Sequence, residues 1–147
     1  MRVHLNIGSN RGHRRALIER AVVALSEALP GPILRSGLFE SEPWGFSSPH
    51  RFLNLAVAID LDTPLPPLRL LDITQEVQNS IDPYPHRTPE GGYADRAIDI
   101  DIIAVDRVVL DHPRLTLPHP RARLRDFVIL PLRQIDPEAA GWIAGET

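Results

Sequence analysis

The segment RAIDIDIIAV at residues 96–105 decides how this chain folds. Isoleucine occupies every second position from Ile98 to Ile102. Side chains alternate across a strand, so these isoleucines share one face and Asp99 and Asp101 share the other. The segment is therefore predicted to be a strand that buries its isoleucines in a core and holds two carboxylates rigidly on its opposite side.

Outward from this strand, the hydrophobic periodicity predicts further strands and helices. Three segments have the character of strands: residues 2–8, 33–41 and 52–61. Helical spacing predicts helices over residues 13–29 and from an N-cap at Thr63 to about residue 81. The order β-α-β-β-α-β predicts an α+β, ferredoxin-like sandwich, a mainly antiparallel sheet with helices on one face. The other face is expected to be open for a ligand.

The remaining segments have weaker patterns. Residues 82–95 are predicted to form a long loop rich in proline and glycine, of the kind that is usually functional or disordered. Residues 111–126 are expected to be irregular, with a helical turn near Arg121, and residues 127–135 are apolar.

Length and composition exclude several classes of protein. A chain of 147 residues fits a single domain over residues 1–147. It has no cysteine, and all 16 of its basic residues are arginine, so cysteine nucleophiles, thiolate metal sites and P-loop lysines are excluded. A net charge of −3 opposes nucleic-acid binding. No membrane segment or signal peptide is apparent, so we expect a cytoplasmic protein, working as a monomer on small molecules.

The paired acids suggest a metal site. Like-charged carboxylates about 7 Å apart along a strand repel unless a cation lies beside them. Hard oxygen ligands suit Mg²⁺, which commonly takes one or two carboxylates together with substrate phosphates. The alternative is an ordinary strand with a solvated acidic face. Arg96 and the long loop before it favour a metal–phosphate site.

Two further groups of residues suggest ligand contacts. Arg114, Thr116, His119 and Arg125 combine guanidinium, hydroxyl and imidazole groups that suit phosphate oxygens, although a solvated loop would have similar residues. Aromatic residues also gather near one amide, which could stack on a flat heterocycle and read its edge: Trp44, Phe46, Phe52 and Asn54. The alternative for this second group is a small packing cluster under a loop.

Together these motifs resemble the 6-hydroxymethyl-7,8-dihydropterin pyrophosphokinase family of the folate pathway. The similar stretches are I-G-S-N at 7–10, F-L-N at 52–54, D-R-A-I-D-I-D-I at 95–102, R-L-T-L-P-H-P at 114–120 and R-D-F-V-I-L-P-L at 125–132. The resemblance covers nearly the whole chain. It implies a ferredoxin-like enzyme that transfers the terminal pyrophosphoryl group of ATP to the pterin hydroxymethyl oxygen and releases AMP.

The resemblance also implies roles for individual residues. Asp99 and Asp101 would bind two Mg²⁺ ions. The pterin would contact Ser41, Glu42, Trp44, Phe52, Asn54 and Phe127. ATP, the co-substrate, would contact Gln75, Gln78, Tyr93, Arg96, Ile102, Arg114, Thr116, His119 and Arg125.

The chain departs from the family pattern before the acids. Gly92-Tyr93-Ala94-Asp95-Arg96 replaces the common Arg-Trp-Gly-Pro-Arg run, so one upstream arginine is missing, and Arg87 is the candidate to supply its charge. Gln78 stands where a glutamate is common, and Ile81-Asp82-Pro83 replaces the usual Gly-Arg tract.

Other functions use the same features. A Mg²⁺-dependent nucleotidyltransferase or phosphohydrolase would also need the acids, whereas a ferredoxin-like nucleotide-binding regulatory module would not need them beside arginines. The products formed from ATP and the pterin distinguish these possibilities.

Overall fold

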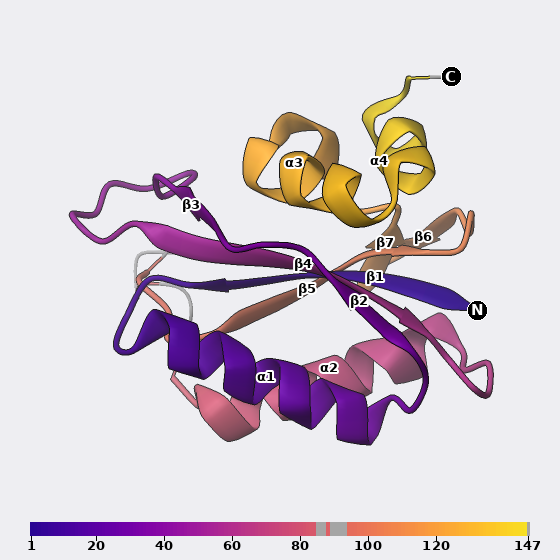
Figure 1. Cartoon of the computed structure of the whole chain (residues 1–147), viewed down its shortest axis with the longest axis horizontal. Helices are drawn as coiled ribbons and strands as arrows, with labels where there is room; N and C mark the ends of the chain where they lie inside the picture. The colour runs from indigo at the N-terminus through magenta and orange to yellow at the C-terminus, as the bar shows by residue number, and fades with distance from the viewer. Residues whose placement is uncertain (85–87, 89–93, 147) are drawn as a thin grey trace.

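A central antiparallel sheet organises the chain (Figure 1). The structure is a computed structural model, and it describes residues 1–84, 88 and 94–146. Its strands lie in the order β2-β4-β1-β5. β3 also pairs with β4, at the start of that strand, whereas β2 pairs nearer its end. The strands are β1 (Arg2–Ser9), β2 (Ile33–Arg35), β3 (Phe39–Ser41), β4 (Phe52–Asp60) and β5 (Asp99–Val105). A separate hairpin consists of β6 (Leu110–His112) and β7 (Leu115–Leu117).

Helices lie on both faces of the sheet (Figure 1). α1 (Arg14–Ala28) and α2 (Pro67–Ile81) cover one face, as the β-α-β-β-α-β order requires. The opposite face carries α3 (Asp126–Ile135) and α4 (Pro137–Ala144), which follow the 3₁₀ turn η1 (Ala122–Leu124). The predicted ferredoxin-like fold is confirmed, and α3 and α4 add a layer that leaves only part of the second face open.

The alternation of β1 divides the interior in two. Val3, Leu5 and Ile7 pack into the cluster beneath α1 and α2. His4 and Asn6 are also buried, but alternation places them on the opposite face, toward α3 and α4. A polar strand face is therefore buried only because the C-terminal helices lie over it.

Two predicted elements differ in their bounds. The strand predicted over residues 33–41 is two short strands, β2 and β3, separated by a bend. The N-cap of α2 is Pro66 rather than Thr63. A residue that precedes proline is disfavoured in the α region, and Leu65 and Pro66 both precede one, so the helix begins only at Pro67.

Two of the segments with weak sequence patterns, residues 111–126 and 127–135, are ordered, whereas most of the predicted loop over residues 82–95 lies outside the described residues. Residues 111–126, expected to be irregular, contribute to the β6–β7 hairpin and form the turn η1 near Arg121, where a helical turn was expected. The apolar segment 127–135 lies in α3, which has Pro131 in its interior.

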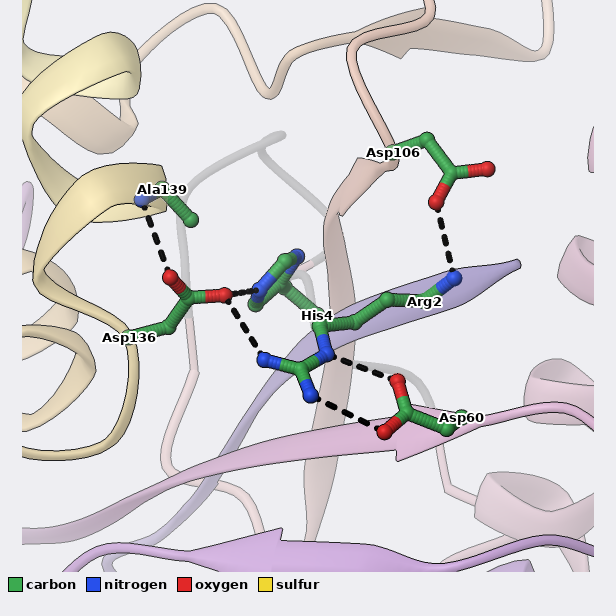
Figure 2. Close-up of polar contacts among 6 residues, drawn as sticks. All are labelled: Arg2, His4, Asp60, Asp106, Asp136 and Ala139. Carbon is green, nitrogen blue, oxygen red and sulfur yellow. Dashed lines mark hydrogen bonds and ion pairs between the residues drawn. The ribbon is translucent and has the colours of Figure 1, made fainter.

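A polar cluster fastens the C-terminal helices to β1 (Figure 2). The Asp136 carboxylate accepts hydrogen bonds from His4 Nε2 at 2.7 Å and Arg2 Nη1 at 3.2 Å, and it caps α4 by accepting from Ala139 N at 3.1 Å. Arg2 also binds both Asp60 oxygens, at 2.7 and 2.9 Å. One carboxylate thus joins a helix N-terminus to the sheet.

Candidate active site

Two adjoining hollows meet at the paired acids of β5. We call the first the aromatic hollow because Trp44, Phe46, Phe52 and Phe127 line it. The outer hollow lies between α2, the outer edge of β5 and the segment around β7. Asp99 and Asp101 line both hollows, so a molecule in one is within reach of the same carboxylates as a molecule in the other.

The aromatic hollow contains all the residues that the sequence predicted for the pterin. They come from β3, the following loop, β4 and α3, and they are Ser41, Glu42, Trp44, Phe52, Asn54 and Phe127. Phe46 meets the Phe52 ring edge-on, with ring centroids 6.3 Å apart. This fixes one aromatic wall by packing within the hollow itself.

The hydrogen bonds of Asn54 fix the orientation of its amide. Nδ2 donates to the Phe39 carbonyl at 3.0 Å and to Ser41 Oγ at 2.8 Å. Because both amide hydrogens are directed at protein atoms, Oδ1 is left as the acceptor. A Cβ atom added to Gly8 would lie 3.4 Å from Asn54 Oδ1, which is van der Waals contact. The missing side chain of Gly8 therefore keeps the space beside this acceptor open.

The outer hollow contains most of the residues that the sequence predicted for ATP. They are Gln75, Gln78, Ile102, Arg114, Thr116 and His119. Arg96 and Arg125 line the aromatic hollow instead. The Arg125 guanidinium lies 4.4 Å from the centroid of the Trp44 ring and 5.6 Å from that of Phe127. The Arg125 cation therefore lies against two aromatic rings of the predicted heterocycle site.

The outer edge of β5 is hydrogen-bonded between the two acids, at Ile100, and after them, at Ile103. Gln78 Oε1 accepts from the Ile100 N–H at 2.8 Å, and the His119 N–H donates to the Ile103 carbonyl at 2.8 Å. β5 is an edge strand, and these contacts satisfy backbone groups that an edge would otherwise leave unpaired. The strand that carries the acids is thereby held from α2 and from the segment after β7.

His119 is a neutral hydrogen-bond donor at ordinary pH. Burial, reinforced by the positive charges of Arg125 and Arg121, lowers the pKa of His119 to about 4. Its Nδ1 accepts from the Arg121 N–H at 3.2 Å, which places the proton of the neutral ring on Nε2. An uncharged N–H in the outer hollow suits a phosphate or ribose oxygen.

The donor set at the acids fits a metal ion that is shared with a ligand. Arg96 Nη1 lies 2.9 Å from Asp99 Oδ2, so one acid already balances a cation. Within residues 1–84, 88 and 94–146, no group of three or more His, Cys, Asp or Glu side chains could hold a metal by itself. Mg²⁺ usually completes its octahedral shell with phosphate oxygens and water, so two carboxylates are sufficient for a Mg²⁺–nucleotide complex.

Two predicted residues, Arg87 and Tyr93, lie outside the described residues. Their roles stay as predictions. The ligands assigned to the other predicted site residues also stay predictions.

Sequence reasoning missed two buried residues that hold the segment before β5. Asp82 Oδ2 accepts from the N–H groups of Ala97 at 2.8 Å and Ile98 at 3.3 Å. Asn10 Nδ2 donates to the His50 carbonyl and the Asp95 carboxylate, and its Oδ1 accepts from the Arg96 N–H at 2.7 Å. The signals that could have identified them are the departure Ile81-Asp82-Pro83 for Asp82 and the I-G-S-N motif for Asn10.

An aromatic hollow and a hollow lined by arginine, histidine and hydroxyl groups, which meet at two acids, fit the class of proteins that bring a nucleotide and a flat second substrate together. The chain belongs to the 7,8-dihydro-6-hydroxymethylpterin-pyrophosphokinase (HPPK) family, whose family model matches residues 4–137.

Curated relatives agree with the family match. A protein of Porphyromonas gingivalis named 2-amino-4-hydroxy-6-hydroxymethyldihydropteridine pyrophosphokinase is 40% identical over 136 residues, covering 92% of this chain and 90% of that protein. Proteins with the same name are 38% identical in Methylorubrum extorquens, over 99% of this chain and 88% of theirs, and 33% identical in Bacillus subtilis, over 90% and 76%.

The solved structures support the fold. The Plasmodium falciparum HPPK-DHPS structure with SDX-DHP aligns with a TM-score of 0.66 at 15% identity, over 93% of this chain. This chain spans only 41% of that longer protein. A second structure, the wild-type protein with pteroate, gives a TM-score of 0.65 at 15% identity. No described helix of this chain is long and apolar enough to cross a membrane.

Proposed function

We propose that this chain transfers pyrophosphate from ATP to the hydroxymethyl group of 6-hydroxymethyl-7,8-dihydropterin, in the synthesis of tetrahydrofolate. The observation that carries the proposal is the meeting of the aromatic hollow and the outer hollow at Asp99 and Asp101. The family match and the names of the relatives support the same reaction.

The pterin would bind in the aromatic hollow. Its flat ring would stack between Phe52 of β4 and Phe127 of α3. Asn54 Oδ1, left as an acceptor, suits the N–H groups on the pterin edge. Trp44 would cover the ring from the loop after β3.

ATP would bind in the outer hollow. Arg114 and the neutral His119 would contact its polar oxygens, and Gln75 and Ile102 would line the nucleoside. The triphosphate would then lead toward the acids of β5 and reach Arg96 and Arg125 on the other side.

The reaction would be a displacement at phosphorus. The hydroxymethyl oxygen attacks the β-phosphorus of ATP, the bond from that phosphorus to the oxygen of the α-phosphate breaks, AMP leaves, and the hydroxyl proton passes to solvent. Arg96 and Arg125 hold and neutralise the transferred phosphates, and the walls of the two hollows align the reacting groups. Mg²⁺ ions held by Asp99 and Asp101 would supply further charge neutralisation.

The chain would work in the cytoplasm, where ATP is available, and as a monomer. The two hollows bring together the residues predicted for both substrates, apart from Arg87 and Tyr93, which supports a site built within one subunit.

Product analysis tests the proposed function. The protein is incubated with ATP, Mg²⁺ and the reduced hydroxymethyl pterin, and the products are identified by mass spectrometry. AMP together with a pterin diphosphate, formed in equal amounts, is the expected result. Release of pyrophosphate or free phosphate would instead indicate a nucleotidyltransferase or a phosphohydrolase, and nucleotide binding without turnover would indicate a regulatory module.

A further inference from the structure

Asn6 is an unexpected residue in the middle of β1. Asparagine is depleted in strands, and a buried amide is unfavourable unless it is hydrogen-bonded. Asn6 is only 5% exposed and lines the aromatic hollow between Ala56 of β4 and Asp101 of β5. Its Nδ2 donates to the main-chain carbonyl of Phe127 at 3.1 Å.

The Phe127 carbonyl lacks its usual hydrogen-bond donor because of the sequence of α3. In an α-helix the carbonyl of residue 127 accepts from the N–H of residue 131. Residue 131 is proline, which has no N–H and whose ring crowds the carbonyl four residues before it. Pro131 therefore leaves the Phe127 carbonyl without its helical partner, and Asn6 provides the missing donor.

We infer that Asn6 is a positioning residue for the pterin site: with Pro131 it fixes the first turn of α3 and thereby the ring of Phe127. Pro131 removes the helical donor of the Phe127 carbonyl, and Asn6, which lines the same hollow as the Phe127 ring, donates to that carbonyl instead. This inference rests on the proposed stacking role of Phe127.

Nearby contacts do not replace this one. His4, two residues earlier on the same face of β1, binds Asp136 at the start of α4. His4 thus holds the far end of the C-terminal layer, whereas Asn6 holds the end that enters the hollow. This difference provides a matched control on the same strand.

The first experiment measures binding. Asn6→Ala is compared with His4→Asn and with Phe127→Ala, and the affinities for the pterin and for Mg²⁺–ATP are measured by calorimetry. Asn6→Ala is expected to weaken pterin binding by about five- to tenfold, the size of one net hydrogen bond, with ATP affinity changed less than twofold. Asn6→Thr, which favours the strand conformation but has no amide, is measured in parallel as a second variant.

The second experiment tests the partnership with Pro131 without any ligand. Pro131→Ala restores an N–H at position 131, which can bind the Phe127 carbonyl within the helix. The loss of stability caused by Asn6→Ala, measured by urea unfolding, is expected to be clearly smaller in the Pro131→Ala background than in the wild type. Additive effects of the two substitutions would overturn the inference.

The outcomes separate this inference from the proposed function. If Phe127→Ala leaves pterin affinity unchanged, the proposed stacking site is wrong. If Phe127→Ala weakens pterin binding but Asn6→Ala does not, the site stands and the role of Asn6 is overturned. If Asn6→Ala and His4→Asn weaken pterin binding equally, the effect is a general one of the C-terminal layer, and the role of Asn6 is overturned. If Asn6→Ala lowers the affinities for ATP and for the pterin equally, the effect acts through Asp101, and the role of Asn6 is likewise overturned.

Discussion

Asp99 illustrates how one side chain in this site serves two kinds of partner. Its carboxylate binds the Arg96 guanidinium at 2.9 Å and also faces the junction of the two hollows. Ile98 and Ile100, on its two sides, are buried on the opposite face of the strand. The main chain at this position is therefore fixed by the core, so a change of the carboxylate should alter chemistry rather than folding.

Asp99→Asn is expected to lower turnover by on the order of a hundredfold to a thousandfold, the size of effect seen when a preorganised charge is removed from an active site. The Tm should stay close to that of the wild type. Steady-state kinetics at varied Mg²⁺ concentration measure the effect, and Asp62→Asn, an exposed acid after β4, is the control. Wild-type turnover and Mg²⁺ dependence in Asp99→Asn would contradict the assignment.

Phe127→Ala is expected to weaken pterin binding by at least about tenfold, because an aromatic contact and its buried area are both lost. ATP affinity, measured on the same preparation, is the internal control and should hardly change. Calorimetric titrations that show equal losses for the two ligands would refute the stacking role.

At the scale of elements, β5 is an edge strand held by single hydrogen bonds from other segments rather than by a further strand. The Gln78 side chain of α2 accepts from the Ile100 N–H, and the main-chain N–H of His119 donates to the Ile103 carbonyl. The Asp82 carboxylate accepts from the N–H of Ala97, just before the strand. Asp82 is 2% exposed, so its hydrogen bonds to Ala97 and Ile98 are sheltered from water. The position of the paired acids thus depends on the end of α2.

Asp82→Ala is expected to destabilise the protein by about 3 kcal/mol, because two sheltered N–H groups would lose their acceptor. The free energy of unfolding from urea titration measures this loss. Turnover should also fall, since the segment that positions Arg96 and Asp99 would loosen. A stability within about 0.5 kcal/mol of the wild type would show that Asp82 does not hold this segment.

At the scale of the whole molecule, the C-terminal layer is attached to the sheet through ionisable groups. Burial lowers the pKa of His4, although its hydrogen bond to Asp136 acts in the opposite direction. Burial alone would raise the pKa of Asp136, but its hydrogen bonds with His4, Ala139 and Arg2 lower it below the ordinary value. A neutral His4 that donates from Nε2 to a charged Asp136 is therefore the stable arrangement.

The pH dependence of stability follows from these directions. The folded pKa of His4 lies below its ordinary value of 6.5, so the unfolded chain binds the proton first and stability falls as pH drops below about 6.5. His119, with a folded pKa of about 4, contributes in the same direction. Asp60 and Asp136, whose pKa values are lowered from 3.8, add a second loss as pH falls below that value.

Urea unfolding at a series of pH values between about 8 and 3 measures this profile. His4→Asn should reduce the first decline and leave the part contributed by His119. A profile that is flat through the histidine range in the wild type would contradict the proposed neutral state of His4.

The sequence by itself determined the main strands of the sheet, the two helices that cover its first face and many of the residues that line the two hollows. Alternation and helical spacing are local signals, and they were strong in β1, β4 and β5 because one face of each strand is apolar. The same signals placed Asp99 and Asp101 on one face of a rigid strand.

The tertiary structure alone decided what covers the second face and which polar residues hold it there. α3 contains a proline in its interior, a local signal that opposes a helix, and only the docking of this segment on the sheet stabilises it. The partners of Asn6, Asn10 and Asp82 lie 121, 86 and 15 residues away along the chain. Side-chain hydrogen bonds across such separations leave no periodicity in a sequence, because they depend on where the folded elements meet.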